Sequence, residues 1–123
     1  MAAQSPAEVH RLFVAAFNAG DLDALLALYE PGATMIPEPG QLVVGREAVR
    51  NVLSAFLALK GSMTIETKTV AQAGDLALLH GQWTLTAAGP DGKPATRGGR
   101  TAEVVRRQPD GSWRYAIDDP YGE

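Results

Sequence analysis

The stretch VRNVLSAFLALKGSMTIETKTVAQ, residues 49–72, contains the change in hydrophobic period that decides the fold. Before Gly61 the apolar residues recur every three or four positions, at 49, 52, 53, 56 and 57, which is typical of one helix face. After Gly61 apolar and polar residues alternate, as they do in a half-buried strand. The chain therefore changes from helical to extended structure at this glycine.

Four extended segments follow Gly61, at residues 63–72, 75–87, 95–108 and 112–119. Each pair is separated by a short stretch rich in turn-forming residues: Ala73-Gly74-Asp75, Gly89-Pro90-Asp91-Gly92 and Pro109-Asp110-Gly111. Short turns of this kind join neighbouring antiparallel strands. The second half of the chain therefore predicts an antiparallel meander.

Upstream of residue 49 the pattern predicts two more helices. Ser5 and Glu8 have the spacing of a capping box, and the apolar stripe that follows them stops at Gly20. Asp21 is placed to cap a second, short helix, in which Leu22, Leu25, Leu26 and Tyr29 share one face. Residues 33–40, ATMIPEPG, form an extended piece that is too rich in proline for a central strand.

Helices followed by an antiparallel sheet predict one α+β domain over residues 1–123. The net charge of −3 gives no basic face for nucleic acid, and the absence of cysteine excludes disulfides and thiolate metal sites. Residues 1–10 have no signal-peptide pattern, and no apolar run is long enough to span a bilayer. We therefore expect a cytoplasmic protein without membrane or nucleic-acid partners.

Several segments, in this order, resemble the SnoaL-like branch of the nuclear transport factor 2 and ketosteroid isomerase-like superfamily. They cover nearly the whole chain: FNAGDLDALLALYEPGAT (17–34), GREAVRNVL (45–53), GQWTL (81–85) and RQPDGSWRYAIDDP (107–120). The resemblance implies a cone made of a strongly curved, mostly antiparallel sheet packed on three N-terminal helices, with a pocket at its open end. It also implies a homodimer that pairs through the outer face of the sheet.

The steroid isomerases of this superfamily place a base Asp after the second helix and an oxyanion hole made by a Tyr and a protonated Asp. Matched onto this sequence, the Tyr position falls on Phe13, the base position on Pro37 and the strand Asp near Glu103. Two of the three groups are replaced, including the base. The resemblance therefore does not predict a steroid isomerase.

The same register places His80, Glu103 and Asp118 on the pocket face, and these three residues are the predicted catalytic groups. It places Trp83 on the outer face, although a slip of one residue would exchange the two faces. A carboxylate among apolar side chains and a neighbouring imidazole can form an acid–base pair near neutral pH.

Structural roles compete with this interpretation. Glu103 has a plain alternative in a cross-strand pair with Arg97, Arg100 or Arg114. The apolar residues on the other face of its strand argue for Asp118 being outside. His80 has an alternative as a structural histidine, Asp119 as a surface acid, and His10, beside Arg11, is expected in solvent.

These features predict a small-molecule-binding protein with an apolar pocket for a hydrophobic molecule. If it is an enzyme, we expect isomerisation, cyclisation or dehydration of a hydrophobic carbonyl compound, on analogy with the resemblance and with no cofactor or metal. Glu103 or Asp118 would then be the base, and His80 the acid or positioning group. The alternative is a non-catalytic dimerisation or adaptor module that uses the outer sheet face.

Overall fold

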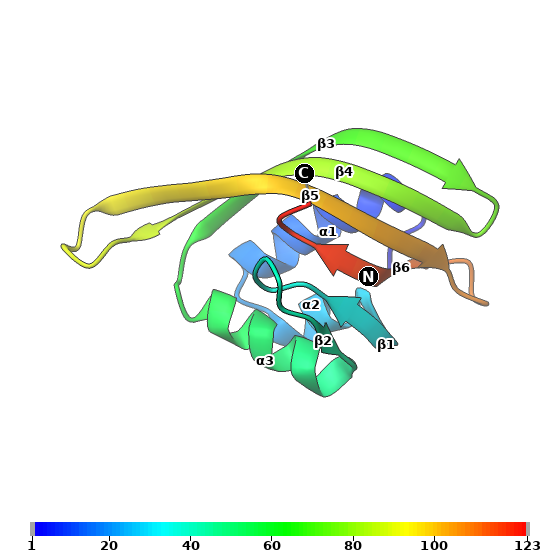
Figure 1. Ribbon diagram of the computed structural model, residues 1–123, viewed down its shortest axis with the longest axis horizontal. Helices are drawn as coiled ribbons and strands as arrows, with labels where there is room; N and C mark the ends of the chain where they lie inside the picture. The colour runs from blue at the N-terminus through cyan, green and yellow to red at the C-terminus, as the bar shows by residue number, and fades with distance from the viewer. Residues whose placement is uncertain (1, 123) are drawn as a thin grey trace.

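The computed structural model describes residues 2–122 and shows one curved sheet that partly encloses its helices (Figure 1). The helices are α1 (Pro6–Asn18), α2 (Leu22–Leu26) and α3 (Arg46–Leu57). The strands are β1 (Tyr29–Met35), β2 (Val43–Val44), β3 (Ser62–Ala73), β4 (Leu76–Ala88), β5 (Pro94–Arg107) and β6 (Trp113–Asp119). The α+β prediction is confirmed, with three helices before the meander.

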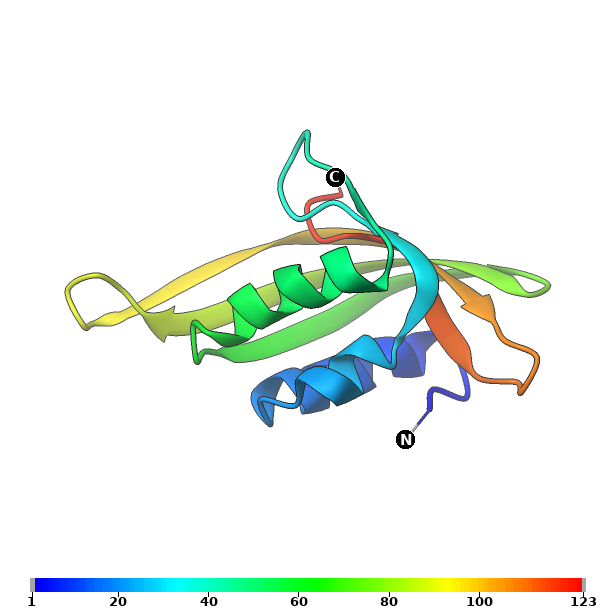
Figure 2. The same ribbon diagram turned by 90° about the horizontal axis from the view of Figure 1, so that it is seen from below.

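The sheet has the strand order β2-β1-β6-β5-β4-β3. From β3 to β6 successive strands pair antiparallel, as their short turns predict. β1 then joins β6 in parallel, so the sheet is mostly antiparallel. Helices α1 and α3 both lie on the concave side of the sheet (Figure 2), where their apolar faces close the core.

The helix ends follow the sequence signals with one difference. Asp21 caps α2 by accepting a hydrogen bond from the Ala24 N–H at 3.0 Å, and Gly20 before it has a φ of +69°. At the start of α1, however, the Ser5 side chain makes no capping bond. The Glu8 carboxylate instead accepts from the N–H of Gln4, one residue before the cap, at 2.9 Å, so neither bond of the predicted capping box forms among the described residues.

The first strand begins earlier and lies deeper than predicted. β1 starts at Tyr29, which the helical spacing had placed on the second helix, and it lies between β2 and β6. Pro37 and Pro39 come after β1 and therefore remove no hydrogen bond from its ladder. Beyond β1 the Ile36 N–H donates to the Asp118 carbonyl at 2.9 Å, which holds the next loop against the end of β6.

The predicted facing of β4 is wrong by one residue. Its inner face carries Ala77, Leu79, Gly81, Trp83 and Leu85, all buried, whereas Leu76, Leu78, His80 and Gln82 are exposed on the convex face. Both faces of this strand are apolar near its start, so the alternation alone could not decide which one the helices cover. Of the helices in the described part of the chain, none is long and apolar enough to cross a membrane.

Candidate functional site

The concave side of the sheet encloses a cavity of about 50 Å³ between the helices and the inner faces of β3 to β6. Aromatic and aliphatic side chains make up most of its wall, and the described residues that line it include no lysine or arginine. Its lining consists of Phe13, Phe17, Tyr29, Met35, Leu53, Phe56, Met63, Ile65, Trp83, Leu85, Thr101, Glu103, Tyr115, Asp118 and Pro120. Two carboxyl groups therefore face an apolar space.

Asp118 enters this space from the end of β6. It pairs in register with Glu103 on β5 and with Met35 on β1, so its side chain is surrounded by strands, and it is only 6% exposed. The Tyr29 hydroxyl donates a hydrogen bond of 2.5 Å to Oδ2 of Asp118. Within residues 2–122 no hydrogen bond reaches its other oxygen, Oδ1.

The cavity explains how Oδ1 is accommodated. Among the described residues every fully enclosed side-chain nitrogen or oxygen has a hydrogen-bond partner. Because Oδ1 of Asp118 has no partner, it is not fully enclosed by protein atoms. Asp118 lines the cavity, which is the open space beside this oxygen. Oδ1 is therefore the oxygen of Asp118 that is left without a protein partner at the cavity.

Burial changes the protonation of this carboxyl. Desolvation, followed by the negative charge of Glu103, raises the pKa of Asp118 from 3.8 to about 8, against the opposing effect of the Tyr29 hydrogen bond. Asp119 adds a smaller repulsion that also raises this pKa. At neutral pH Asp118 is therefore mostly a neutral carboxylic acid.

The position of that proton follows from Tyr29. Burial, and then the charge of Asp118, raise the pKa of Tyr29 well above its ordinary value, so the phenol keeps its proton. Because Tyr29 donates to Oδ2, the proton of the neutral Asp118 is held on Oδ1, which faces the cavity. The site therefore offers a ligand one buried hydrogen-bond donor of carboxylic acid type.

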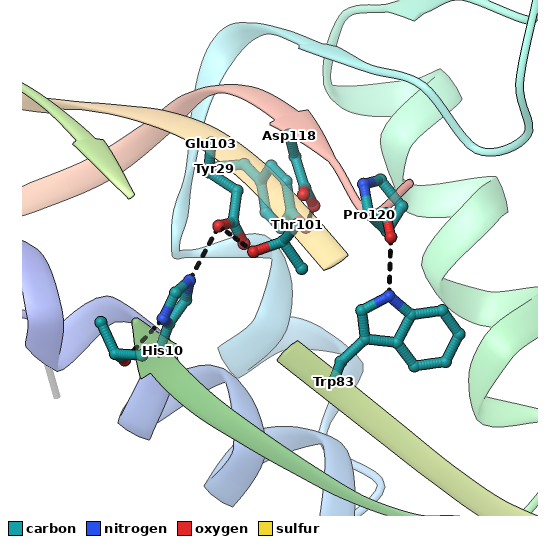
Figure 3. Close-up of polar contacts among 8 residues, drawn as sticks. His10, Tyr29, Trp83, Thr101, Glu103, Asp118 and Pro120 are labelled. Carbon is teal, nitrogen blue, oxygen red and sulfur yellow. Dashed lines mark hydrogen bonds and ion pairs between the residues drawn. The ribbon is translucent and has the colours of Figure 1, made fainter. Parts of the chain in front are cut away.

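Glu103 is held by a second set of contacts. The Thr101 hydroxyl donates to its Oε1 at 2.6 Å, and His10 Nε2 lies 2.8 Å from the same oxygen. His10 Nδ1 is 2.8 Å from the Thr67 hydroxyl, so the imidazole joins α1 to both β3 and β5. Figure 3 shows these contacts beside the Tyr29 and Asp118 side chains.

A glycine makes room for the imidazole. A Cβ atom at Gly81 on β4 would lie 3.0 Å from Cε1 of His10 and 3.2 Å from the Glu66 carbonyl oxygen. His10 is 2% exposed at this position. The GQWTL segment therefore supplies the space in which the His10–Glu103 contact forms.

Two of the three predicted catalytic residues meet at the cavity, and the third does not. Glu103 and Asp118 are cross-strand neighbours that both point inward. His80 lies on the opposite, convex face, beside Lys68 and Arg100 in a shallow surface depression. The expected inward orientation of His80 is therefore a wrong prediction, which follows from the one-residue error in the facing of β4.

Other predicted placements also change. Trp83 points into the cavity, and His10, expected in solvent, is buried against Glu103. Among the described residues the basic side chain that contacts Glu103 is His10, and none of the three candidate arginines pairs with it. His10 had a signal in the sequence, since it lies three residues before Phe13 and seven before Phe17, which both line the cavity.

The steroid isomerase positions can now be located. Phe13 and Glu103 line the cavity, whereas Pro37 lines a neighbouring groove. The base position of the isomerases is thus occupied here by a residue without a titratable group. Within residues 2–122 no three His, Cys, Asp or Glu side chains are grouped so as to hold a metal ion.

The chain folds back over the cavity after β6. The Trp83 indole N–H donates to the Pro120 carbonyl at 2.6 Å, and the Trp83 ring meets the Tyr121 ring edge-on at 6.0 Å (Figure 3 shows the first contact). Arg97 donates to the Tyr121 hydroxyl at 2.9 Å. The segment from Pro120 to Tyr121 therefore forms part of the cavity wall.

A curved six-stranded sheet around helices, with a polar cluster in its hollow, defines the class of nuclear transport factor 2-like cone proteins. The chain belongs to the SnoaL-like domain family, whose sequence profile matches residues 9–116. No curated protein matches the sequence. The resemblance that the sequence motifs indicate is thereby confirmed at the level of family and fold.

Three solved structures illustrate how varied the relatives are. A provisionally named calcium/calmodulin-dependent protein kinase II association domain from Xanthomonas campestris is 25% identical, with a TM-score of 0.79 over 95% of this chain and 86% of its own. A ketosteroid isomerase-like protein from Erwinia carotovora atroseptica is 22% identical (TM-score 0.78; 92% and 89%). A provisionally named dehydratase from Streptomyces avermitilis is 19% identical (TM-score 0.74; 92% and 90%). At these identities the last two show the shared fold alone.

Proposed function

We propose that the cavity binds a small, mostly apolar carbonyl compound and that Asp118 and Glu103 act on it as acid and base. The Oδ1–H of Asp118 would donate to the carbonyl oxygen, and a carboxylate oxygen of Glu103 would accept a proton from the adjacent carbon. The product of this step is an enol. Transfer of the Glu103 proton to another carbon, with return of the enol O–H proton to Asp118, gives an isomer. In a β-hydroxy compound the enol returns its O–H proton to Asp118 while the β-hydroxyl group leaves with the proton held by Glu103, which gives an alkene and water.

One observation carries the proposal, namely the buried Asp118 carboxyl group that lines an apolar cavity and is bound through one oxygen only, by Tyr29. A hydrogen bond from such a donor is not weakened by water, and it strengthens as negative charge develops on the carbonyl oxygen. His10 and Thr101 fix Glu103 beside it, so His10 is a positioning residue and not a group that touches the substrate. This chemistry needs no cofactor.

The direct test is proton exchange from the carbon next to a carbonyl. 2-Butanone in D₂O is incubated with the protein, and the loss of its α-proton signal is followed by ¹H NMR. We expect Asp118→Asn to slow the protein-dependent exchange about 100-fold, a typical size for removal of one acid group. Asp119→Asn, at the half-buried neighbour whose carboxylate binds the Tyr121 N–H, is the matched control. Equal rates for wild type and Asp118→Asn would exclude the mechanism.

The convex face favours a second candidate function, self-association. Leu78 on β4, Val104 on β5 and Ile117 on β6 are register partners that form an apolar row across the centre of the sheet. Leu78 is 38% and Ile117 42% exposed. A two-fold axis through the row would bring the same row of a second copy against it, so the face is self-complementary.

We propose that a second copy of the chain covers this row and that the protein is a homodimer. Sedimentation at micromolar concentration should give a dimer for the wild type and a monomer for Leu78→Glu. Leu59→Glu, at a 43% exposed leucine beyond the end of α3, is the control and should stay dimeric. A wild-type monomer would refute the homodimer and leave the cavity proposal untouched.

A further inference from the structure

The cavity is small for the ligand that its chemistry suits. Its volume of about 50 Å³ compares with roughly 150 Å³ for an apolar protein cavity that binds benzene, and with about 300 Å³ or more for common ligand pockets. A carbonyl compound of more than a few heavy atoms would therefore have to extend beyond the cavity. One wall of the cavity must therefore open to admit the part of such a molecule that does not fit inside.

A groove of about 310 Å³ lies on the other side of one wall. It runs between α3 and the loop after β1, and its lining consists of Pro37, Glu38, Gln41, Val43, Val52, Ala55, Phe56, Arg97 and Tyr121. Among the described residues Phe56 alone lines both spaces. The end of β6 and the loop after β1 lie close together at this edge (Figures 1 and 2).

The partition between the two spaces is made in part of one side chain and one two-residue segment. It includes the Phe56 side chain, which is half-buried on α3, and the Pro120–Tyr121 segment, of which Pro120 faces the cavity and Tyr121 the groove. A half-exposed aromatic ring can change rotamer without disturbing the backbone on either side. A turn of the Phe56 ring would therefore join the two spaces while the sheet stays in place.

We infer that the cavity and the groove are two halves of one binding site, and that Phe56 sets the length of the molecule that it accepts. The inference rests on the proposed function, because the carbonyl group is taken to lie at Asp118. The groove is apolar at Val43, Val52 and Ala55 and polar at Glu38, Gln41 and Arg97. The ligand class is then an elongated carbonyl compound with an apolar middle and a polar far end.

The test uses methyl ketones of increasing length, from 2-butanone to 2-nonanone, and the indole N–H signal of Trp83 as the reporter. Trp83 lines the cavity, and the signal of the other tryptophan is identified with Trp113→Phe. Each methylene that is transferred from water to the apolar groove should tighten binding about fourfold. We expect affinity to keep rising after the ketone exceeds the cavity in size.

Two variants of α3 locate the far end of the ketone. Ala55→Phe places a ring in the groove, and Ser54→Phe places the same ring one position along, on an exposed residue that lines neither space. We expect Ala55→Phe to lower the ratio of 2-nonanone to 2-butanone affinity about tenfold, and Ser54→Phe to leave it unchanged. Phe56→Ala should raise the ratio, because the long ketone no longer has to displace the ring.

The outcomes separate this inference from the proposed function. In one outcome 2-butanone binds and Asp118→Asn weakens its binding, but Ala55→Phe changes the ratio of 2-nonanone to 2-butanone affinity no more than Ser54→Phe does. That outcome overturns only the two-part site. An affinity that stops rising once the ketone fills the cavity overturns it too. If no ketone shifts the Trp83 signal, or Asp118→Asn leaves 2-butanone affinity unchanged, the proposed function itself fails.

Discussion

The two faces of β4 have similar compositions and opposite roles. The concave face carries Trp83 and the gap at Gly81, and it meets α1 and a pair of buried carboxyl groups. The convex face carries Leu78, His80 and Gln82, all exposed. A histidine is associated with each face: His10 reaches the inner face from α1, whereas His80 belongs to the outer face.

The contrast shows that the surroundings of a histidine, more than its place in a strand, decide what it does. His10 is 2% exposed and contacts Thr67 and Glu103, so its imidazole is part of the fold and of the candidate site. His80 is in contact with solvent beside cationic side chains, where an imidazole has little influence on the core. Substitutions at the two positions should therefore differ sharply.

The largest expected effect is the loss of stability in His10→Ala. The substitution removes the imidazole that lies 2.8 Å from Oε1 of the buried Glu103, and breaking a buried pair in this way typically costs about 3–5 kcal/mol. His80→Ala, on the exposed face, should stay within about 0.5 kcal/mol of wild type. Urea unfolding of both variants gives the comparison. Equal losses of unfolding free energy would show that His10 contributes no more to the stability of the fold than His80 does.

Most of the fold could be predicted from the sequence, because local patterns and turn chemistry agree with it. The change of period at Gly61, the cap at Asp21 and the hairpin turns place three helices and four long strands close to their observed positions. β1 was assigned too far along the chain because Tyr29 has helical spacing to the apolar residues of α2. Its pairing with β6, 80 or more residues away in the chain, leaves no local signal.

The site could be predicted only in part. The register that the resemblance supplies predicts Glu103 and Asp118 on the pocket face, and both line the cavity. The facing of β4 could not be decided, since its apolar residues occupy both faces and only the contact with α1 distinguishes them. The role of His10 depends on a contact across 93 residues, which the sequence alone does not show.

A second comparison, between Asp118 and Asp119, should appear in the pH dependence of stability. The folded protein holds a proton on Asp118 up to a pKa of about 8, whereas the unfolded chain releases it near 3.8. Between these values the folded state binds more protons, so the contribution of Asp118 to stability is largest at low pH and falls as the pH rises, and its slope vanishes above about pH 8.

From pH 5.5 to 7.5 this carboxyl should lower the free energy of unfolding by about 2–3 kcal/mol, at roughly 1.4 kcal/mol per pH unit. Asp118→Asn should flatten the decline, because the amide does not titrate, and Asp119→Asn should preserve it. Urea unfolding at several pH values measures both slopes. A wild-type profile as flat as that of Asp118→Asn would mean that the carboxyl is ionised in the folded protein.

The smallest expected effect is a difference in stability between two glycine-to-alanine variants, Gly81→Ala and Gly32→Ala. It tests how tightly the concave face of the sheet packs around His10. A methyl group at Gly81 would lie 3.0 Å from the His10 ring and 3.2 Å from a backbone oxygen, so His10 would have to shift against Glu103. We expect Gly81→Ala to cost about 1–2 kcal/mol by overpacking. Gly32→Ala is the matched control, since Gly32 lies in β1, and nothing is within 4 Å of the added atom. Thermal unfolding of the two variants is sufficient for the measurement. If Gly81→Ala is no less stable than Gly32→Ala, the imidazole has room to move, and Glu103 does not depend on a fixed His10 for its position.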